Sequence, residues 1–181
     1  MPQYAVSAIG RDRPGIVAAV TRVLLDHDVN VEDSQMTILR GRFTMMLILA
    51  TPEGGIDEAS LRAELQAAAR GLGLDAVSLE PVAAAEEAPS VEPSHIVTVY
   101  GMDHPGIVQA VATALADASV NITDLETRLV SDDDGADLYA MMLEVALPAA
   151  MSQGELEAAL ASIPREQGVE VSIRELERDE L

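Results

Sequence analysis

The stretch GRDRPGIV (residues 10–17) recurs 91 residues later as GMDHPGIV (residues 101–108). The same offset carries Asn30 onto Asn121, so the similarity extends beyond the motif itself. Self-similarity at a fixed distance is the sequence signature of a repeated structural unit. The 181-residue chain is therefore expected to contain two copies of one module.

The composition changes between the two copies. The stretch AAAEEAPSVEPS (residues 83–94) is rich in Ala, Glu, Pro and Ser and has no apolar periodicity, which is typical of a linker. We therefore expect a first domain over residues 1–82 and a second domain over residues 95–181.

Both copies predict the same order of strands and helices. A short apolar run rich in β-forming residues precedes each motif, and apolar residues at helical spacing follow it. Two strands, a second helix (residues 57–71 and 152–163) and a final strand complete each copy. Ser152 and Glu155 open the later of these helices in a capping-box pattern. The order βαββαβ folds as two interleaved right-handed crossovers, which give a four-stranded antiparallel sheet with two helices on one face. The predicted fold class is α+β, with two ferredoxin-like modules.

One predicted strand suggests that the modules associate. The residues FTMMLILA (43–50) are apolar on both faces of the strand. The sheet face that the helices leave uncovered must then be hidden against the sister module or against a second chain. We expect a homodimer.

The charge balance and the missing residue types exclude several classes of function. The chain has 31 acidic and 11 basic residues, for a net charge of −20, and it contains no lysine. A negative field repels phosphate backbones, so direct binding of nucleic acid is not expected. With no cysteine and three scattered histidines, we expect neither a metal site nor a cofactor.

The sequence also carries no sign of a membrane or of export. No apolar run approaches the roughly 20 residues of a membrane span, and the first residues lack the basic and apolar regions of a signal peptide. We expect a cytoplasmic protein without a membrane partner.

The turn between the first strand and the first helix is the candidate binding site. Gly10 and Gly101 are expected to let the backbone turn sharply, and Gly15 and Gly106 to let a ligand approach the helix. The proline of the motif is expected in the first helical turn, with the preceding aspartate accepting amide hydrogens. Amide hydrogens that stay free lie at the positive end of the helix dipole, which suits a carboxylate.

Asn30 and Asn121 open the second strand of each copy. A carboxamide both donates and accepts hydrogen bonds, so it can hold an amino group or a carboxylate. Turn amides and asparagine together would recognise a zwitterion. The alternatives are structural: the motif simply caps the helix, and each asparagine caps the turn that precedes it.

Two other interpretations of the sequence are weak. The acidic loop SDDDGAD (residues 131–137) overlays part of a calcium-binding loop, but Val130 and Met141 occupy two positions that require acidic ligands. No serine or other nucleophile recurs beside the Asp-His pairs, so no catalytic constellation is evident.

The motif D-x-P-G-I-V after the first strand, with asparagine opening the second, resembles the ACT domain over residues 3–82 and 95–177. The tandem pair resembles the glycine cleavage system transcriptional repressor family and the paired regulatory ACT domains of phosphoserine phosphatase. The resemblance implies a small amino acid bound at interfaces between ACT modules, with turn amides on its carboxylate and asparagine on its amino group. The implied ligand-binding residues are Asp12, Arg13, Pro14, Gly15, Ile16, Val17 and Asn30 in the first copy, and Asp103, His104, Pro105, Gly106, Ile107, Val108 and Asn121 in the second.

These observations predict a non-enzymatic regulatory protein that binds an amino acid such as glycine or serine. It would modulate a regulatory protein partner in the transcriptional control of amino-acid metabolism. Two other classes stay open at this point: a scaffold whose modules dimerise without ligand, and an enzyme like acylphosphatase, which shares the βαββαβ topology and uses an arginine and an asparagine.

Overall fold

The computed structural model describes residues 3–82, 92–131 and 137–176. The chain divides into two compact units, Met1–Glu87 and Ala88–Leu181, which are here called module one and module two. Each module has its own sheet, its own helices and its own hydrophobic core.

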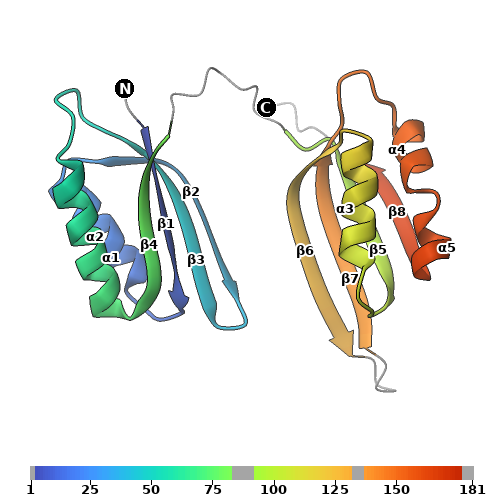
Figure 1. Cartoon of the computed structure of the whole chain (residues 1–181), viewed down its shortest axis with the longest axis horizontal. Coiled ribbons are helices and arrows are strands. Elements are labelled where there is room, and N and C mark those ends of the chain that lie inside the picture. The colour runs from blue at the N-terminus through green and yellow to red at the C-terminus, as the bar shows by residue number, and fades with distance from the viewer. Residues whose placement is uncertain (1–2, 83–91, 132–136, 177–181) are drawn as a thin grey trace. The chain divides into compact units, whose positions relative to one another are not determined.

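Module one has the predicted order of elements. These are β1 (Gln3–Arg11), α1 (Ile16–Asp26), β2 (Asn30–Leu39), β3 (Arg42–Ala50), α2 (Glu58–Leu72) and β4 (Leu74–Val82). The strands form one sheet in the order β2-β3-β1-β4, with antiparallel neighbours. Both helices lie on one face of this sheet (Figure 1). The predicted α+β, ferredoxin-like fold is confirmed.

Module two repeats this topology with one difference. Its elements are β5 (His95–Met102), α3 (Ile107–Asp117), β6 (Asn121–Ser131), β7 (Asp137–Ala146), α4 (Gln153–Leu160), α5 (Ile163–Gln167) and β8 (Val169–Glu175). The sheet order is β6-β7-β5-β8. The helix predicted over residues 152–163 is α4, which ends earlier, at Leu160, and a short additional helix, α5, follows with Pro164 in its first turn. The Ser152 and Glu155 capping box that opens α4 is confirmed.

Each core lies between the helices and the sheet. In β3, Phe43, Met45, Leu47 and Leu49 are buried against the helices, whereas Met46 lies on the other face and is 53% exposed. The sheet face that the helices leave uncovered therefore carries an apolar residue, as predicted. That the sister module or a second chain covers this face stays a prediction.

Gly10 and Gly101 are needed for a different reason from the one that the sequence suggested. Neither glycine has a positive φ, and both lie inside the central strand of their sheet. A Cβ on Gly10 would lie 2.8 Å from the Cα of Leu74, and a Cβ on Gly101 would lie 2.8 Å from the Cγ1 of Val169. The expectation of a sharp turn is wrong: these glycines permit the close approach of β4 and β8.

This packing predicts that Gly10→Ala and Gly101→Ala each lower the free energy of unfolding by roughly 1–3 kcal/mol, the usual cost of overpacking. Urea titration followed by circular dichroism measures the change. Gly71→Ala is the matched control, since a Cβ there meets nothing within 4 Å and alanine is the better helix former inside α2. Wild-type stability for both strand variants would contradict the packing argument.

Candidate functional site

The first candidate site is the corner between β1 and α1, formed by residues 12–18 and here called corner one. Gly15 is the N-cap of α1 with a φ of 97°, a left-handed conformation that glycine adopts at low cost. No side chain among the described residues caps this helix, and the first helical hydrogen bond runs from Ala19 N–H to Gly15 O at 2.9 Å. The amides of residues 16–18 therefore have no partner within the helix and lie at its positive end.

Module two repeats this geometry in residues 103–109, here called corner two. Gly106 is the N-cap of α3 with a φ of 109°, and again no described side chain caps the helix. Ala110 N–H donates to Gly106 O at 2.9 Å, so the amides of residues 107–109 also lack a helical partner. Two corners with the same backbone conformation thus present the same three donors.

The predicted capping chemistry is wrong in both corners. The N-cap is glycine, and Pro14 and Pro105 precede it, so neither proline lies in the first helical turn. Asp12 does not cap α1 with its carboxylate. Its backbone N–H donates to Gly41 O at 2.9 Å, which ties corner one to the hairpin between β2 and β3. Because no side chain in residues 3–82, 92–131 or 137–176 caps either helix, the amides are available to a ligand.

Arg13 and His104 occupy the same motif position and extend toward the same place in their modules. Arg13 Nη2 lies 3.2 Å from where a Cβ of Gly73 would be, at the C-terminal end of α2. His104 Nε2 lies 2.7 Å from Gln167 O, in the last residue of α5, and its Nδ1 lies 3.1 Å from Pro105 O. Both cations therefore lie at the negative end of a helix dipole.

The hydrogen bonds of His104 change its acidity. Carbonyl oxygens accept from both ring nitrogens only when the imidazole is protonated. The bond to Gln167, then the bond to Pro105 and the nearby Asp103 carboxylate raise the pKa of His104, against a smaller opposing effect of desolvation. In its protonated form, His104 therefore links the backbone of corner two to the last residue of α5.

An open groove of about 500 Å³ lies against corner one. All of the residues 12–17, which the sequence analysis nominated, line it. Its remaining lining residues are Ala18 and three side chains of the neighbouring strands: Met36, Ile38 and Phe43. A Cβ on Gly15 would meet nothing within 4 Å, so this corner is not filled by the protein itself.

The strand side chains that line this groove were not predicted from the sequence. Met36 and Ile38 lie on the helix-covered face of β2, opposite the buried Met45 and Phe43, but α1 leaves them 49% and 50% exposed. The available signal in the sequence was the pair of apolar residues at alternate positions of this predicted strand, Met36 and Ile38.

Five of the chain's eleven arginines gather at this end of module one. Arg11 pairs with Arg42 across β1 and β3, and Arg40 adjoins the Gly41 carbonyl that binds Asp12. Arg70 lies in the last turn of α2, and Arg13 approaches the C-cap of that helix, Gly73. Arg42 forms an ion pair with Asp75. In a chain with a net charge of −20, this concentration makes corner one locally favourable for an anion.

The two asparagines do not lie near the corner of their own module. Asn30 is level with Ala50, which pairs with Gln3 at the start of β1, whereas the corner follows Arg11 at the end of β1. Eight residues of strand separate the two ends, or about 26 Å at roughly 3.3 Å per residue. Asn121 likewise pairs with Ala146, at the end of the sheet opposite Met102. One module alone cannot bring its corner and its asparagine onto one small ligand.

The alternative role for the asparagines, capping the turn before the strand, is not supported. Backbone bonds close this turn, from Val29 N–H to Leu24 O and from Val120 N–H to Leu115 O, both at 2.9 Å. The residues with positive φ in these turns are Asp28 and Ser119. No hydrogen bond between described residues uses the side chain of either asparagine, so both remain free for another partner.

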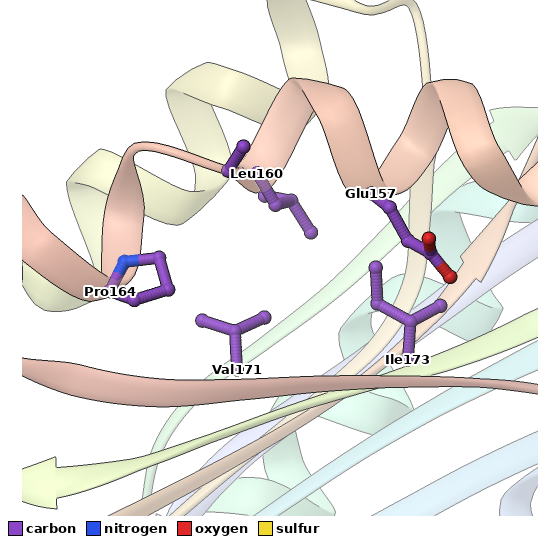
Figure 2. A pocket seen from close by; sticks show the side chains of 6 residues that line it. Glu157, Leu160, Pro164, Val171 and Ile173 are labelled. Atoms are coloured by element: carbon purple, nitrogen blue, oxygen red, sulfur yellow. The ribbon is translucent and has the colours of Figure 1, made fainter.

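A second hollow, of about 230 Å³, lies between α4, α5 and β8 (Figure 2). Leu160 and Pro164 lie above Val171, and Glu157 lies beside Ile173. Its only charged lining residue is acidic. This hollow is a consequence of the break between α4 and α5, and it offers no donor for a carboxylate.

Other kinds of site receive no support from the described residues. Within them, no group of three or more His, Asp or Glu side chains could hold a metal ion. The acidic loop of the calcium interpretation lies largely outside the described residues. No helix in the described part of the chain is long and apolar enough to cross a membrane.

Comparisons with known proteins agree with the fold of both modules. The glycine cleavage system transcriptional repressor of Escherichia coli is 28% identical over 170 residues, which cover 93% of this chain and 87% of the repressor. Phosphoserine phosphatase SerB2 of Mycobacterium tuberculosis is 28% identical over 173 residues, which cover 94% of this chain but 40% of the phosphatase. A crystal structure of a protein of unknown function from Galdieria sulphuraria superimposes with a TM-score of 0.80 and 29% identity, covering 97% of this chain and 99% of that one.

The family model of the ACT domain matches residues 4–78 and 95–174, that is, both modules. The predicted resemblance to tandem ACT proteins is confirmed. With a ferredoxin-like fold, a repeated glycine corner and a family match over most of its length, the chain belongs to the ACT domain family.

Proposed function

We propose that this protein is a regulatory protein that binds a small amino acid at its two corners. The observation that carries this proposal is the pair of uncapped helix starts, each with three free amides behind a left-handed glycine. Amides at a helix N-terminus bind carboxylates through direct hydrogen bonds and through the dipole. The kinship with a transcriptional repressor supports a regulatory role.

The asparagines complete the site in this proposal, and they do so from another molecule. β2 and β6 are edge strands, whose outer backbone groups are free to pair. Antiparallel pairing of β2 with β2 of a second copy would bring Asn30 of one chain to the corner of the other, because each strand starts at the end opposite its own corner. A homodimer thus supplies both halves of the site.

Beyond binding, we propose that ligand occupancy changes association with a regulatory protein partner in the cytoplasm, and that the protein has no catalytic role. Amino-acid binding at the dimer interface would stabilise one arrangement of the modules. The net charge of −20 argues that control of transcription would proceed through protein contacts and not through DNA.

Arg13 and His104 have a bracing role in this proposal. Each lies at the C-terminal end of a later helix of its module, Arg13 beside α2 and His104 beside α5. They fix the position of the amides and need not contact the ligand themselves.

A thermal-shift screen of the twenty amino acids tests the proposed function. A ligand that binds only the folded state adds roughly 2.7 kcal/mol of stability at a hundredfold excess over its Kd. We expect at least one amino acid to raise the melting temperature. No shift at millimolar concentrations would favour a ligand-free scaffold, and release of phosphate from an acyl phosphate would favour an enzyme.

The combined variant Asn30→Ala and Asn121→Ala is expected to abolish the ligand-induced shift. The fold should persist, because neither side chain bonds within the described part of its module. Gln35→Ala, on the exposed surface of β2, is the matched control and should retain the shift. Full binding by the double asparagine variant would remove these residues from the site.

His104→Ala is expected to destabilise the protein more at pH 5.5 than at pH 8.5. The raised pKa means that the stabilising charge is fully present below about 6.5, the ordinary histidine value, and is lost as the pH rises through the higher folded value. Urea unfolding at both pH values measures this, with Arg13→Ala as a control whose effect should not depend on pH in this range. An equal loss at both pH values would contradict the charged brace.

A further inference from the structure

The two corners have the same backbone but differ in the side chains beside them. The strand registers of the two modules make Met36 equivalent to Thr127. Met36 pairs with the buried Met45 of β3, and Thr127 pairs with the corresponding buried methionine of β7, Met141. They likewise make Phe43 equivalent to Tyr139, because each pairs with the close-approach glycine. Two apolar side chains of module one are therefore hydroxyl-bearing in module two.

The first helical turn differs in the same direction. Ala18, which lines the corner-one groove, is equivalent by the 91-residue offset to Gln109. Gln109 is exposed and its Nε2 donates to Thr113 Oγ1 at 3.0 Å. Ile38 and its equivalent Leu129 stay apolar, and they are 50% and 47% exposed. All three changes of chemistry lie around one corner, and each one is from apolar to polar.

The corner-one groove is suited to an apolar side chain. Its floor is Phe43, which is buried, and its wall is formed by Met36 and Ile38, which are half exposed. The unbranched methionine adapts to varied apolar shapes. The volume of about 500 Å³ leaves far more room than glycine fills. A ligand that covers these side chains removes apolar surface from water, which favours binding.

The same positions in module two are suited to a smaller, polar ligand. The Tyr139 hydroxyl hydrogen-bonds Thr127 and lies 3.9 Å from Met141 Sδ, and burial raises the pKa of this phenol. Thr127 and Gln109 are exposed and place polar side chains beside the corner, although each also bonds within its module, Thr127 to Tyr139 and Gln109 to Thr113. An alkyl side chain laid over these polar side chains would remove them from water without replacing any hydrogen bond, whereas a hydroxyl group can bond to them.

We infer that the two modules bind different amino acids: corner one takes one with a long apolar side chain, of the leucine or methionine class, and corner two takes a small or hydroxyl-bearing one, of the glycine or serine class. This inference rests on the proposed function and assigns its ligand classes. Met36 and Thr127 are the residues that determine this difference in ligand preference. Both lie at the exposed edge of the site, and one side chain is apolar whereas the other bears a hydroxyl group.

Isothermal titration of the full chain with leucine, methionine, serine and glycine tests the assignment. The wild type should bind an apolar and a small amino acid at separate sites, without competition. Met36→Thr should weaken the apolar ligand about tenfold or more, the usual effect of lost apolar contact in a pocket, and should leave serine or glycine binding unchanged. Thr127→Met should do the reverse, weakening the small polar ligand and admitting the apolar one.

Met46→Thr is the matched control. It makes the same substitution in the same sheet at a residue of similar exposure, but on the face away from the helices. It should leave both affinities unchanged. Circular dichroism and urea unfolding check the fold of each variant: Met36 is half exposed, whereas Thr127→Met also removes the hydrogen bond to the buried Tyr139.

The outcomes separate this inference from the function on which it rests. If the wild type binds amino acids but Met36→Thr and Thr127→Met leave the preferences unchanged, or if one amino acid fills both sites equally, the inference is overturned and the proposed function stands. If no amino acid binds the wild type, both are overturned.

Discussion

The conformation of one glycine in each module determines how the candidate sites are built. Gly15 and Gly106 adopt left-handed backbone angles at the point where the central strand gives way to a helix. Glycine takes the place of a side-chain cap, and no described side chain accepts a hydrogen bond from the first amides of α1 and α3. Amides at such a helix start bond to water or to a ligand. The repetition of this arrangement in both modules is the observation that supports the proposed binding role.

The second constraint comes from the topology of the sheet. Because β2 runs parallel to β1 across the intervening β3, Asn30 starts at the end of the sheet far from its own corner. Module two repeats this separation. A site that uses both elements therefore needs a contribution from outside its own module, and in the proposed homodimer ligand binding would be coupled to association. Such coupling would give a small ligand a physical means of regulating a protein partner.

The sequence predicted the fold well because the repeat doubled every signal. The order of elements, the antiparallel sheets and the Ser152 capping box all followed from periodicity and capping patterns. The role of Gly10 was misjudged, since only the packing of Leu74 against β1 shows why a side chain is excluded there. The short helix α5 was not predicted, although a proline suited to a first helical turn was the available signal. The groove beside corner one depends on how far α1 extends over β2, which local sequence does not specify.

The most direct measurement is a titration of the isotopically labelled protein with amino acids, followed through the backbone amide resonances in two-dimensional NMR spectra. The account predicts that residues 16–18 and 107–109 show the largest and saturable shifts, with Asn30 and Asn121 side-chain amides moving at the same ligand concentrations. Saturable binding that leaves these six amides unmoved, and shifts resonances elsewhere, would contradict it.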